Sequence, residues 1–226
     1  MTACVERLEI VFPTKEERRR AALYSSKKPM ASVSVCLDNG RAREIVIPIK
    51  AANVLDATDL PFPMPEEEAF ERIHEIEYRA CLAAIADMVS RREHSTGELR
   101  EKLARYGYRE QEIDRALTTA GERRYVDDDR FTRFFIEERI RRGWGRRKIE
   151  LELRRRGVSV DDIEGYPECY FSEEDDLDRA VALLRKKMTP DNRPQDKFIR
   201  YLIARGFSYG VAREAASIRL SDIEDF

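Results

Sequence analysis

Hydrophobic and polar positions alternate with a period of two over the first part of the chain. Residues 31–37 and 43–49 follow this pattern and are rich in β-branched side chains, and residues 8–12 form a shorter apolar run. The turn signal Asp-Asn-Gly at 38–40 separates the two longer runs, so the pattern predicts a β-hairpin over 31–49. Because three short strands are marginally stable alone, we expect a helix to pack on this sheet.

A cluster of prolines ends the β-rich part. Pro61, Pro63 and Pro65 oppose regular structure, because proline fixes φ and has no N–H to donate. The charged stretch 15–28, which precedes the hairpin, is expected to form a loop or a short helix. The sequence therefore predicts a small β-rich N-terminal extension over residues 1–65.

Beyond Pro65 the apolar residues follow the period of a helix. One predicted helical face consists of Tyr78, Cys81, Leu82, Ile85, Met88 and Val89. Helix starts are predicted at Ser95 and Ser172, each followed by an acid three residues later as in a capping box, and at Asp127. The rest of the sequence is therefore expected to be helical.

The helical part contains an internal repeat. Leu99, Leu103, Gly107 and Tyr108 recur 50 positions later as Ile149, Leu153, Gly157 and Val158, and 49 further on as Phe198, Leu202, Gly206 and Phe207. In the same register, Cys81, Ile85 and Ile113 recur as Phe131, Phe135 and Ile163 and then as Ala180, Leu184 and Ala212. Seven columns that share one register indicate a triplicated unit.

Each unit is predicted to hold a long first helix, a second helix that ends at the shared glycine, and a third helix after a tight turn. The glycine is expected to be left-handed, so that the apolar residue after it folds back on the preceding helix. Gly165 and Pro167 interrupt the second unit, leaving 159–164 room for barely one or two turns of its third helix.

These patterns predict a mainly α fold. We expect an elongated array of three tandem three-helix repeats, over residues 66–124, 125–171 and 172–226, preceded by the small β-rich extension. Repeats that contact only their neighbours stack into open arrays, and we expect a monomer.

Composition and missing motifs narrow the functional class. Charged residues make up 38% of the chain, the net charge is −2, and no apolar run approaches the length of a membrane helix. The four cysteines form no CxxC pair, and the two histidines offer no metal-ligand spacing. Neither a phosphate-binding glycine loop nor a hydrolase motif occurs. We expect a cytoplasmic, non-enzymatic protein with no cofactor, no metal and no membrane contact.

Positive charge is concentrated in residues 139–156, which we call the basic segment. It carries a net charge of +7 and contains the single tryptophan of the chain. The candidate partner- and nucleic-acid-binding residues are Arg139, Arg141, Arg142, Trp144, Arg146, Arg147, Lys148, Arg154, Arg155 and Arg156. Such density suits nucleic acid or an acidic protein surface, with an aromatic ring able to stack. The alternative is a solvated face that pairs with the acidic stretches 127–129 and 161–164, with Trp144 in the core.

A helix that follows a glycine turn also suggests a helix-turn-helix module, whose latter helix reads bases. Here that helix would begin at 109–112 and at 159–162, and both stretches carry carboxylates. Because carboxylates repel phosphates, sequence-specific reading by these helices is disfavoured.

Three stretches resemble signatures of the RecX family, regulators of the RecA recombinase. They are residues 92–99 with Lys102, Leu103 and Gly107; residues 125–131; and residues 142–145 with Ile149, Glu152, Leu153 and Gly157. The resemblance is specific over about 80–220 and looser over 1–79, where many members carry a small β-rich extension.

The resemblance implies a regulator that binds the RecA–DNA filament and mostly inhibits its ATPase, strand exchange and SOS co-protease activities. Its partners would be the RecA filament and single- or double-stranded DNA, bound independently of sequence. Two alternatives stay open from the residues themselves: a stand-alone, sequence-independent DNA-binding protein, and a helical-repeat scaffold for another protein.

Overall fold

The computed structural model describes residues 3–24 and 27–224. The chain divides into two compact units, Met1–Asp127 and Asp128–Phe226. Within the described residues, the first unit holds a four-stranded antiparallel sheet and five helices, and the second is helical. The mainly α fold with a small β-rich start is confirmed.

The sheet of the first unit has the strand order β3-β2-β1-β4. Its strands are β1 (Cys4–Val11), β2 (Met30–Leu37), β3 (Ala42–Pro48) and β4 (Met64–Pro65). The predicted hairpin is present as the β2–β3 pair, in register from Met30↔Pro48 to Cys36↔Ala42. Alternate residues of β2 are buried, which is the burial that its period of two requires.

Two details of the extension differ from the sequence prediction. The proline cluster does not exclude regular structure, because Met64 and Pro65 pair with Val5 and Cys4 as the edge strand β4. Proline is tolerated at a sheet edge, where its missing N–H costs no ladder bond. The apolar run after the turn leaves the sheet at Pro48, and Ile49 begins a helix instead of continuing the strand.

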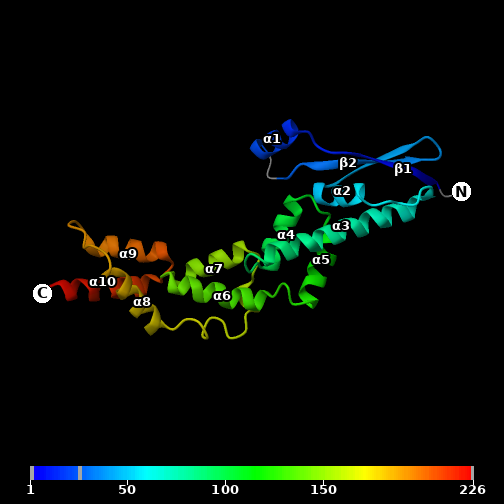
Figure 1. Ribbon diagram of the computed structural model, residues 1–226. Helices are drawn as coiled ribbons and strands as arrows, with labels where there is room; N and C mark the ends of the chain where they lie inside the picture. Colours follow the sequence, from blue (N-terminus) through cyan, green and yellow to red (C-terminus); the bar gives the residue numbers. More distant parts are fainter. Residues whose placement is uncertain (1–2, 25–26, 225–226) are drawn as a thin grey trace. The chain divides into compact units, whose positions relative to one another are not determined.

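The helices described for residues 3–24 and 27–127 complete the first unit. They are α1 (Lys15–Tyr24), α2 (Ile49–Asp56), α3 (Glu66–Val89), α4 (Thr96–Arg105) and α5 (Glu110–Glu122). α1 confirms the short-helix alternative for residues 15–28. Figure 1 shows α2 and α3 along one side of the sheet, where Ala51, Ala52, Leu55, Ala69 and Ile73 are buried in one core with the strands. The expected helical cover of the sheet is therefore present.

The predicted helix starts carry their caps. The Ser95 hydroxyl accepts a hydrogen bond from the Glu98 backbone N–H at 3.1 Å, and that of Ser172 accepts one from Asp175 at 3.0 Å. Each bond satisfies a donor that has no partner inside the helix. Asp127 directly precedes the next helix, α6 (Asp128–Arg141).

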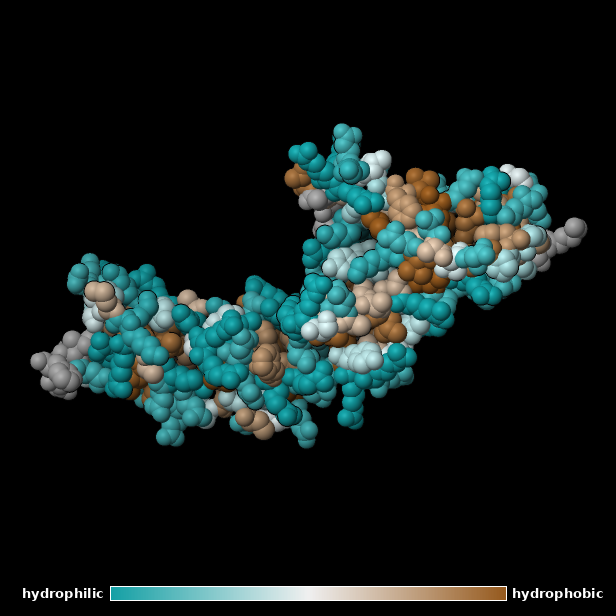
Figure 2. Space-filling model, viewed as in Figure 1, coloured by the Kyte–Doolittle hydropathy of each residue, from teal (hydrophilic) through white to brown (hydrophobic). Residues whose placement is uncertain are grey.

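The second unit spans the residues that the sequence predicts as the second and third repeats. Its elements are α6, α7 (Arg146–Arg155), the 3₁₀ turn η1 (Val160–Asp162), α8 (Glu173–Arg185), α9 (Pro194–Arg205) and α10 (Tyr209–Glu224). The third helix of the middle repeat is reduced to η1, as Gly165 and Pro167 predict. Hydrophilic residues dominate the face of this unit shown in Figure 2.

The three repeat glycines end their helices as predicted. Gly107, Gly157 and Gly206 have φ values of +90°, +71° and +96°. After each, a backbone N–H returns to the preceding helix; that of Val158, for example, bonds Leu153 O at 3.0 Å. The apolar residues Tyr108, Val158 and Phe207 are buried, as a Schellman turn requires. The other repeated apolar columns are buried too, apart from the half-buried Ile163.

Candidate functional site

The basic segment occupies the end of α6, the loop that follows, and α7. Ile149 and Leu153 anchor α7 in a core with Phe131, Phe135 and Ile136 of α6. These two residues are four apart and therefore lie on one side of the helix. Cations at the intervening positions must point elsewhere.

The solvent side of α7 carries Arg147, Leu151, Arg154 and Arg155, all of them exposed. We call these four residues the outer face of α7. Their spacing places them opposite Ile149 and Leu153 on a helix of 3.6 residues per turn. Leu151 is 47% exposed, so three guanidinium groups surround an unburied apolar side chain.

The loop before α7 is held by the third repeat. The Gly145 N–H donates to Arg205 O at 2.8 Å and the Arg147 N–H to Gly206 O at 3.1 Å. Unpaired N–H groups at the start of α7 thus meet unpaired carbonyls at the end of α9. Arg205 Nη1 also donates to Arg142 O at 3.1 Å. The loop is therefore packed against the end of α9, and we call this contact the α7–α9 joint. The cations that remain available to a partner are those on the helices.

Trp144 lies in this joint. Its half-buried ring packs against the core of the middle repeat, with Lys148 Nζ at 4.1 Å and Arg139 Cζ at 5.0 Å from the ring centroid. Arg139 also lies over Phe135, with Cζ 4.7 Å from the ring, and its side chain is only 16% exposed. These cation–π contacts give Arg139 and Lys148 a packing role around Trp144.

Carboxylates of α6 and α7 neutralise several other cations of the basic segment. Arg146 Nε bonds Glu150 at 2.7 Å, and Tyr166 Oη donates to the same oxygen at 3.0 Å. Hydrogen bonds from Arg156 and Arg155 hold the pKa of Glu152 below its usual range, so Glu152 is ionised at neutral pH. Arg142 pairs with Glu138 of α6. In these ion pairs the carboxylates are Glu138 of α6 and Glu150 and Glu152 of α7.

The ten candidate residues thus separate into distinct environments. Arg146 and Lys148 lie on different sides of α7, one at Tyr166 and the other at Trp144. Arg141 lines a hollow that also contains Glu137 and Glu164. Arg147 and Arg154 are exposed and, among the described residues, pair with no carboxylate. Within the described part of the chain Arg155 pairs with its neighbour Glu152, at 2.8 Å, and an exposed pair of this kind is weak.

Leu151 is the uncharged member of this face and is absent from the ten candidates of the sequence. The signal was present in the sequence as an apolar residue two positions from each of the core residues Ile149 and Leu153. No helix of residues 3–24 and 27–224 combines the length and apolar character needed to cross a membrane.

Comparison with known proteins covers both units. A family model described as "RecX, first three-helix domain" matches residues 81–118, and one described as "RecX, second three-helix domain" matches residues 127–165.

Two curated relatives match most of their own length. A "Regulatory protein RecX" of Haemophilus influenzae (strain PittEE) is 36% identical over 129 residues, which is 54% of this chain and 84% of the relative. One of Vibrio vulnificus (strain CMCP6) is 33% identical over 144 residues, 61% of this chain and 92% of the relative.

Two solved structures have a similar fold. The crystal structure of RecX from Lactobacillus salivarius has a TM-score of 0.54 at 17% identity, over 63% of this chain and 96% of that one. A crystal structure of a regulatory protein RecX has a TM-score of 0.56 at 16% identity, over 92% of this chain and 96% of that one.

Proposed function

This chain belongs to the RecX family, whose curated members are regulatory proteins, and we propose that it regulates the RecA recombinase by binding the RecA–DNA filament. In this proposal it acts as a monomer without catalysis of its own, and it mostly inhibits RecA ATPase, strand exchange and SOS co-protease activity. A regulator of this kind acts on the ATPase of its partner and needs no ATP-hydrolysing site of its own.

The observation that carries the contact is the outer face of α7. Arg147, Arg154 and Arg155 are exposed around Leu151, on a helix whose opposite side is fixed by Ile149 and Leu153. Guanidinium groups bind phosphate oxygens and carboxylates alike, whereas an exposed leucine gains from contact with protein. The combination suits a filament, which offers phosphates and protein surface together.

Several residues of the basic segment pack or pair within the protein itself. Arg139, Lys148 and Trp144 pack on one another, and Arg146 is bonded to Glu150. We therefore assign the filament contact to Arg147, Leu151, Arg154 and Arg155.

The test is inhibition of RecA ATPase on single-stranded DNA by wild type and by the triple variant Arg147→Gln, Arg154→Gln and Arg155→Gln. Glutamine is about as good a helix former as arginine, so helical content should not change. A matched control, Arg41→Gln with Lys197→Gln and Arg213→Gln, removes the same charge from exposed positions elsewhere.

We expect wild type and the control to inhibit, and the α7 variant to need roughly tenfold more protein, as when about 1.4 kcal/mol of binding is lost. Full inhibition by the α7 variant, with circular dichroism like wild type, would show that α7 does not make the filament contact. Failure of wild type to inhibit at all would contradict the function itself.

A further inference from the structure

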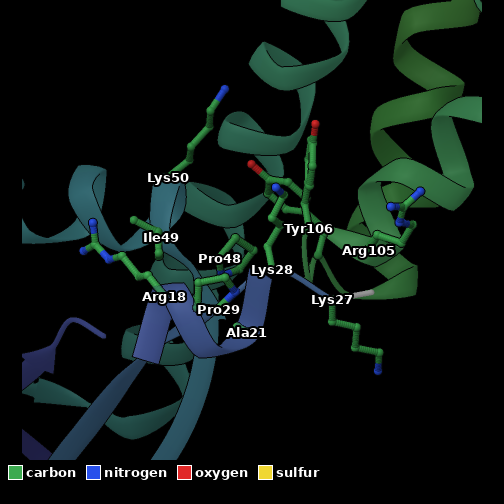
Figure 3. Close-up of a pocket in the computed structure, with 11 residues that line it drawn as sticks. Arg18, Ala21, Lys27, Lys28, Pro29, Pro48, Ile49, Lys50, Arg105 and Tyr106 are labelled. Carbon is green, nitrogen blue, oxygen red and sulfur yellow. The ribbon is translucent and has the colours of Figure 1, made fainter. Parts of the chain in front are cut away.

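The first unit contains a cavity that the proposed filament contact does not use. Its volume is about 590 Å³, in the range of small-ligand sites. α1, the segment before β2, the start of α2 and the turn after α4 form its walls. Residues far apart in the sequence therefore meet here (Figure 3).

The charge of this cavity has one sign. Arg18, Lys28 and Lys50 line it from three separate elements, and no carboxylate is found among the described residues of its lining. Figure 3 shows Lys28 beside Tyr106, with the side chain of Arg18 extending to the left and that of Lys50 extending upward, whereas Lys27 and Arg105 extend to the opposite side. Three like charges around one hollow raise the local concentration of anions.

The uncharged part of the lining is mainly apolar. It consists of Ala21, Pro29, Pro48, Ile49, Tyr106 and Tyr108. Pro29 and Pro48 have no N–H, so this end of the β2–β3 pair offers an incoming peptide strand few backbone donors. An aromatic ring beside cations, here Tyr106 beside Lys28, is a combination with which proteins bind single-stranded nucleic acid.

The walls are fixed by contacts between the extension and the first repeat. The Lys28 N–H donates to Arg105 O at 2.8 Å, and Tyr108 Oη donates to Ala80 O at 3.2 Å in the core. A Cβ on Gly107 would lie 2.0 Å from Met30 Sδ, so the start of β2 sits directly on this glycine turn. The cavity is thus preformed, which reduces the ordering cost of binding.

We propose that this cavity binds a nucleotide unit, with phosphate at Lys28, Lys50 and Arg18 and the base against Tyr106 and the prolines. Lysine suits phosphate because it acts as a compact point charge. The unit could come from a single strand or from a free nucleotide, which share this chemistry. The β-rich extension and the first repeat would then form a second nucleic-acid site, independent of α7 and of RecA.

The test is binding of a fluorescent oligothymidylate of about ten nucleotides, a length within the usual site size, followed by anisotropy without RecA. The variant that tests the cavity is Lys28→Gln with Lys50→Gln, which we call the cavity pair. The matched control, which we call the control pair, is Arg41→Gln with Lys197→Gln. Both pairs are measured in the full chain. They are also combined with the α7 triple variant, so that the effect of the cavity is measured without the contribution of α7.

We expect the cavity pair to weaken binding on the order of tenfold at about 0.1 M salt and to flatten the log–log salt slope by roughly 1.4, at 0.7 for each phosphate contact to a single strand. The control pair should change neither quantity. An iodouridine-substituted oligonucleotide should crosslink on irradiation to the peptide that contains Tyr106. Equal affinity and slope for the cavity pair and its control would overturn the proposal.

Competition identifies the source of the nucleotide. Displacement by thymidine monophosphate as well as by unlabelled strand supports a free nucleotide as ligand, and displacement by the strand alone supports a single strand. If a glutamate oligomer displaces the probe better than an unlabelled strand of equal charge, the cavity is a peptide site and the proposal is wrong.

Discussion

At the scale of single residues, glycines set how closely the segments of the second unit approach. Gly145 has an ordinary φ of −86°, so its backbone would accept alanine. A Cβ at this position would nevertheless lie 2.4 Å from the backbone of Gly206 and Phe207. The bonds between the start of α7 and the end of α9 therefore depend on a missing side chain.

We predict that Gly145→Ala lowers the unfolding free energy by about 1–3 kcal/mol, as overpacking does. Gly121→Ala is the matched control, because Gly121 lies inside α5 and a Cβ there meets nothing within 4 Å. It should stabilise the chain by about 0.5–1 kcal/mol, since alanine is the better helix former. Urea titration of wild type and both variants measures these changes. A midpoint of Gly145→Ala equal to that of wild type would show that the contact between α7 and α9 tolerates a methyl group.

Conformation at single positions was also what the sequence predicted best. Left-handed Gly107, Gly157 and Gly206 were predictable because each ends an apolar helix pattern and precedes an apolar residue. The packing of Trp144 against the core was one of the two interpretations that the sequence left open. Its contacts with Arg139 and Lys148 were not predictable, because hydrophobic patterns do not count the planar and aliphatic surfaces of cations as apolar.

At the scale of elements, a buried polar cluster joins α3 to α5. Glu77 of α3 is 1% exposed and accepts the Arg109 backbone N–H at 2.9 Å and Arg109 Nε at 3.0 Å. Arg109 precedes α5 and has no side-chain cap of its own, so a carboxylate from another helix supplies the cap. His74 Nε2 lies against Arg109 Nη1, an arrangement that needs an unprotonated nitrogen.

The pH dependence of stability follows from this contact. Burial, and then the charge of Arg109, lower the pKa of His74 from 6.5. Between that lowered value and 6.5 the unfolded chain binds more protons than the folded one, so stability falls as the pH drops through this window. Burial and the charges of Arg92 and Lys102 lower the pKa of His94 in the same direction.

Burial raises the pKa of Glu77, whose protonation acts in the opposite direction. We predict that the two histidines cost wild type stability at about pH 5.5 relative to about pH 7.5, and that His74→Gln reduces this loss. Glutamine can still accept a hydrogen bond from Arg109 but does not titrate. The measurement is urea unfolding at both pH values, with His94→Gln as the parallel variant. An identical loss in wild type and His74→Gln would mean that His74 stays neutral or is equally protonated in both states.

Elements with a strong period were predictable, and short elements were not. The helices that carry the repeated columns, and the β2–β3 hairpin, follow from hydrophobic spacing. β4 was missed because its two residues, Met64 and Pro65, gain their pairing from β1 and have no pattern of their own. α2 was missed because Pro48 ends a β-branched run that continues unchanged in composition through Ile49.

At the scale of the whole molecule, the sequence predicts where charge is dense but not which charges are available. The basic segment is visible as +7 against a net charge of −2. Its reduction to the outer face of α7 depends on the ion pairs Arg146–Glu150 and Arg156–Glu152. It also depends on the packing of Arg139 and Lys148 around Trp144, which the sequence does not reveal. The cavity of the first unit was not predictable, because Arg18, Lys28, Lys50 and Tyr106 come from separate stretches.

The division of charge also determines how the chain should bind bare duplex DNA. A chain of net charge −2 is repelled as a whole by a polyanion, so binding requires local cations that displace counterions. If Arg147, Arg154 and Arg155 each contact one phosphate, their joint contribution to the slope of log Kobs against log salt is roughly −2.7, at 0.9 per contact.

We predict that changing these three arginines to glutamine flattens the slope on duplex DNA by roughly 2–3. The control triple at Arg41, Lys197 and Arg213 should leave the slope unchanged, although it alters the net charge by the same amount. Anisotropy titrations from about 0.05 to about 0.2 M salt, where such slopes are measurable, compare the two. Counterion release depends on contacts and not on total charge, so the two triples must differ. Equal flattening by both would show that binding follows net charge, and α7 would then have no claim to be the DNA-facing surface.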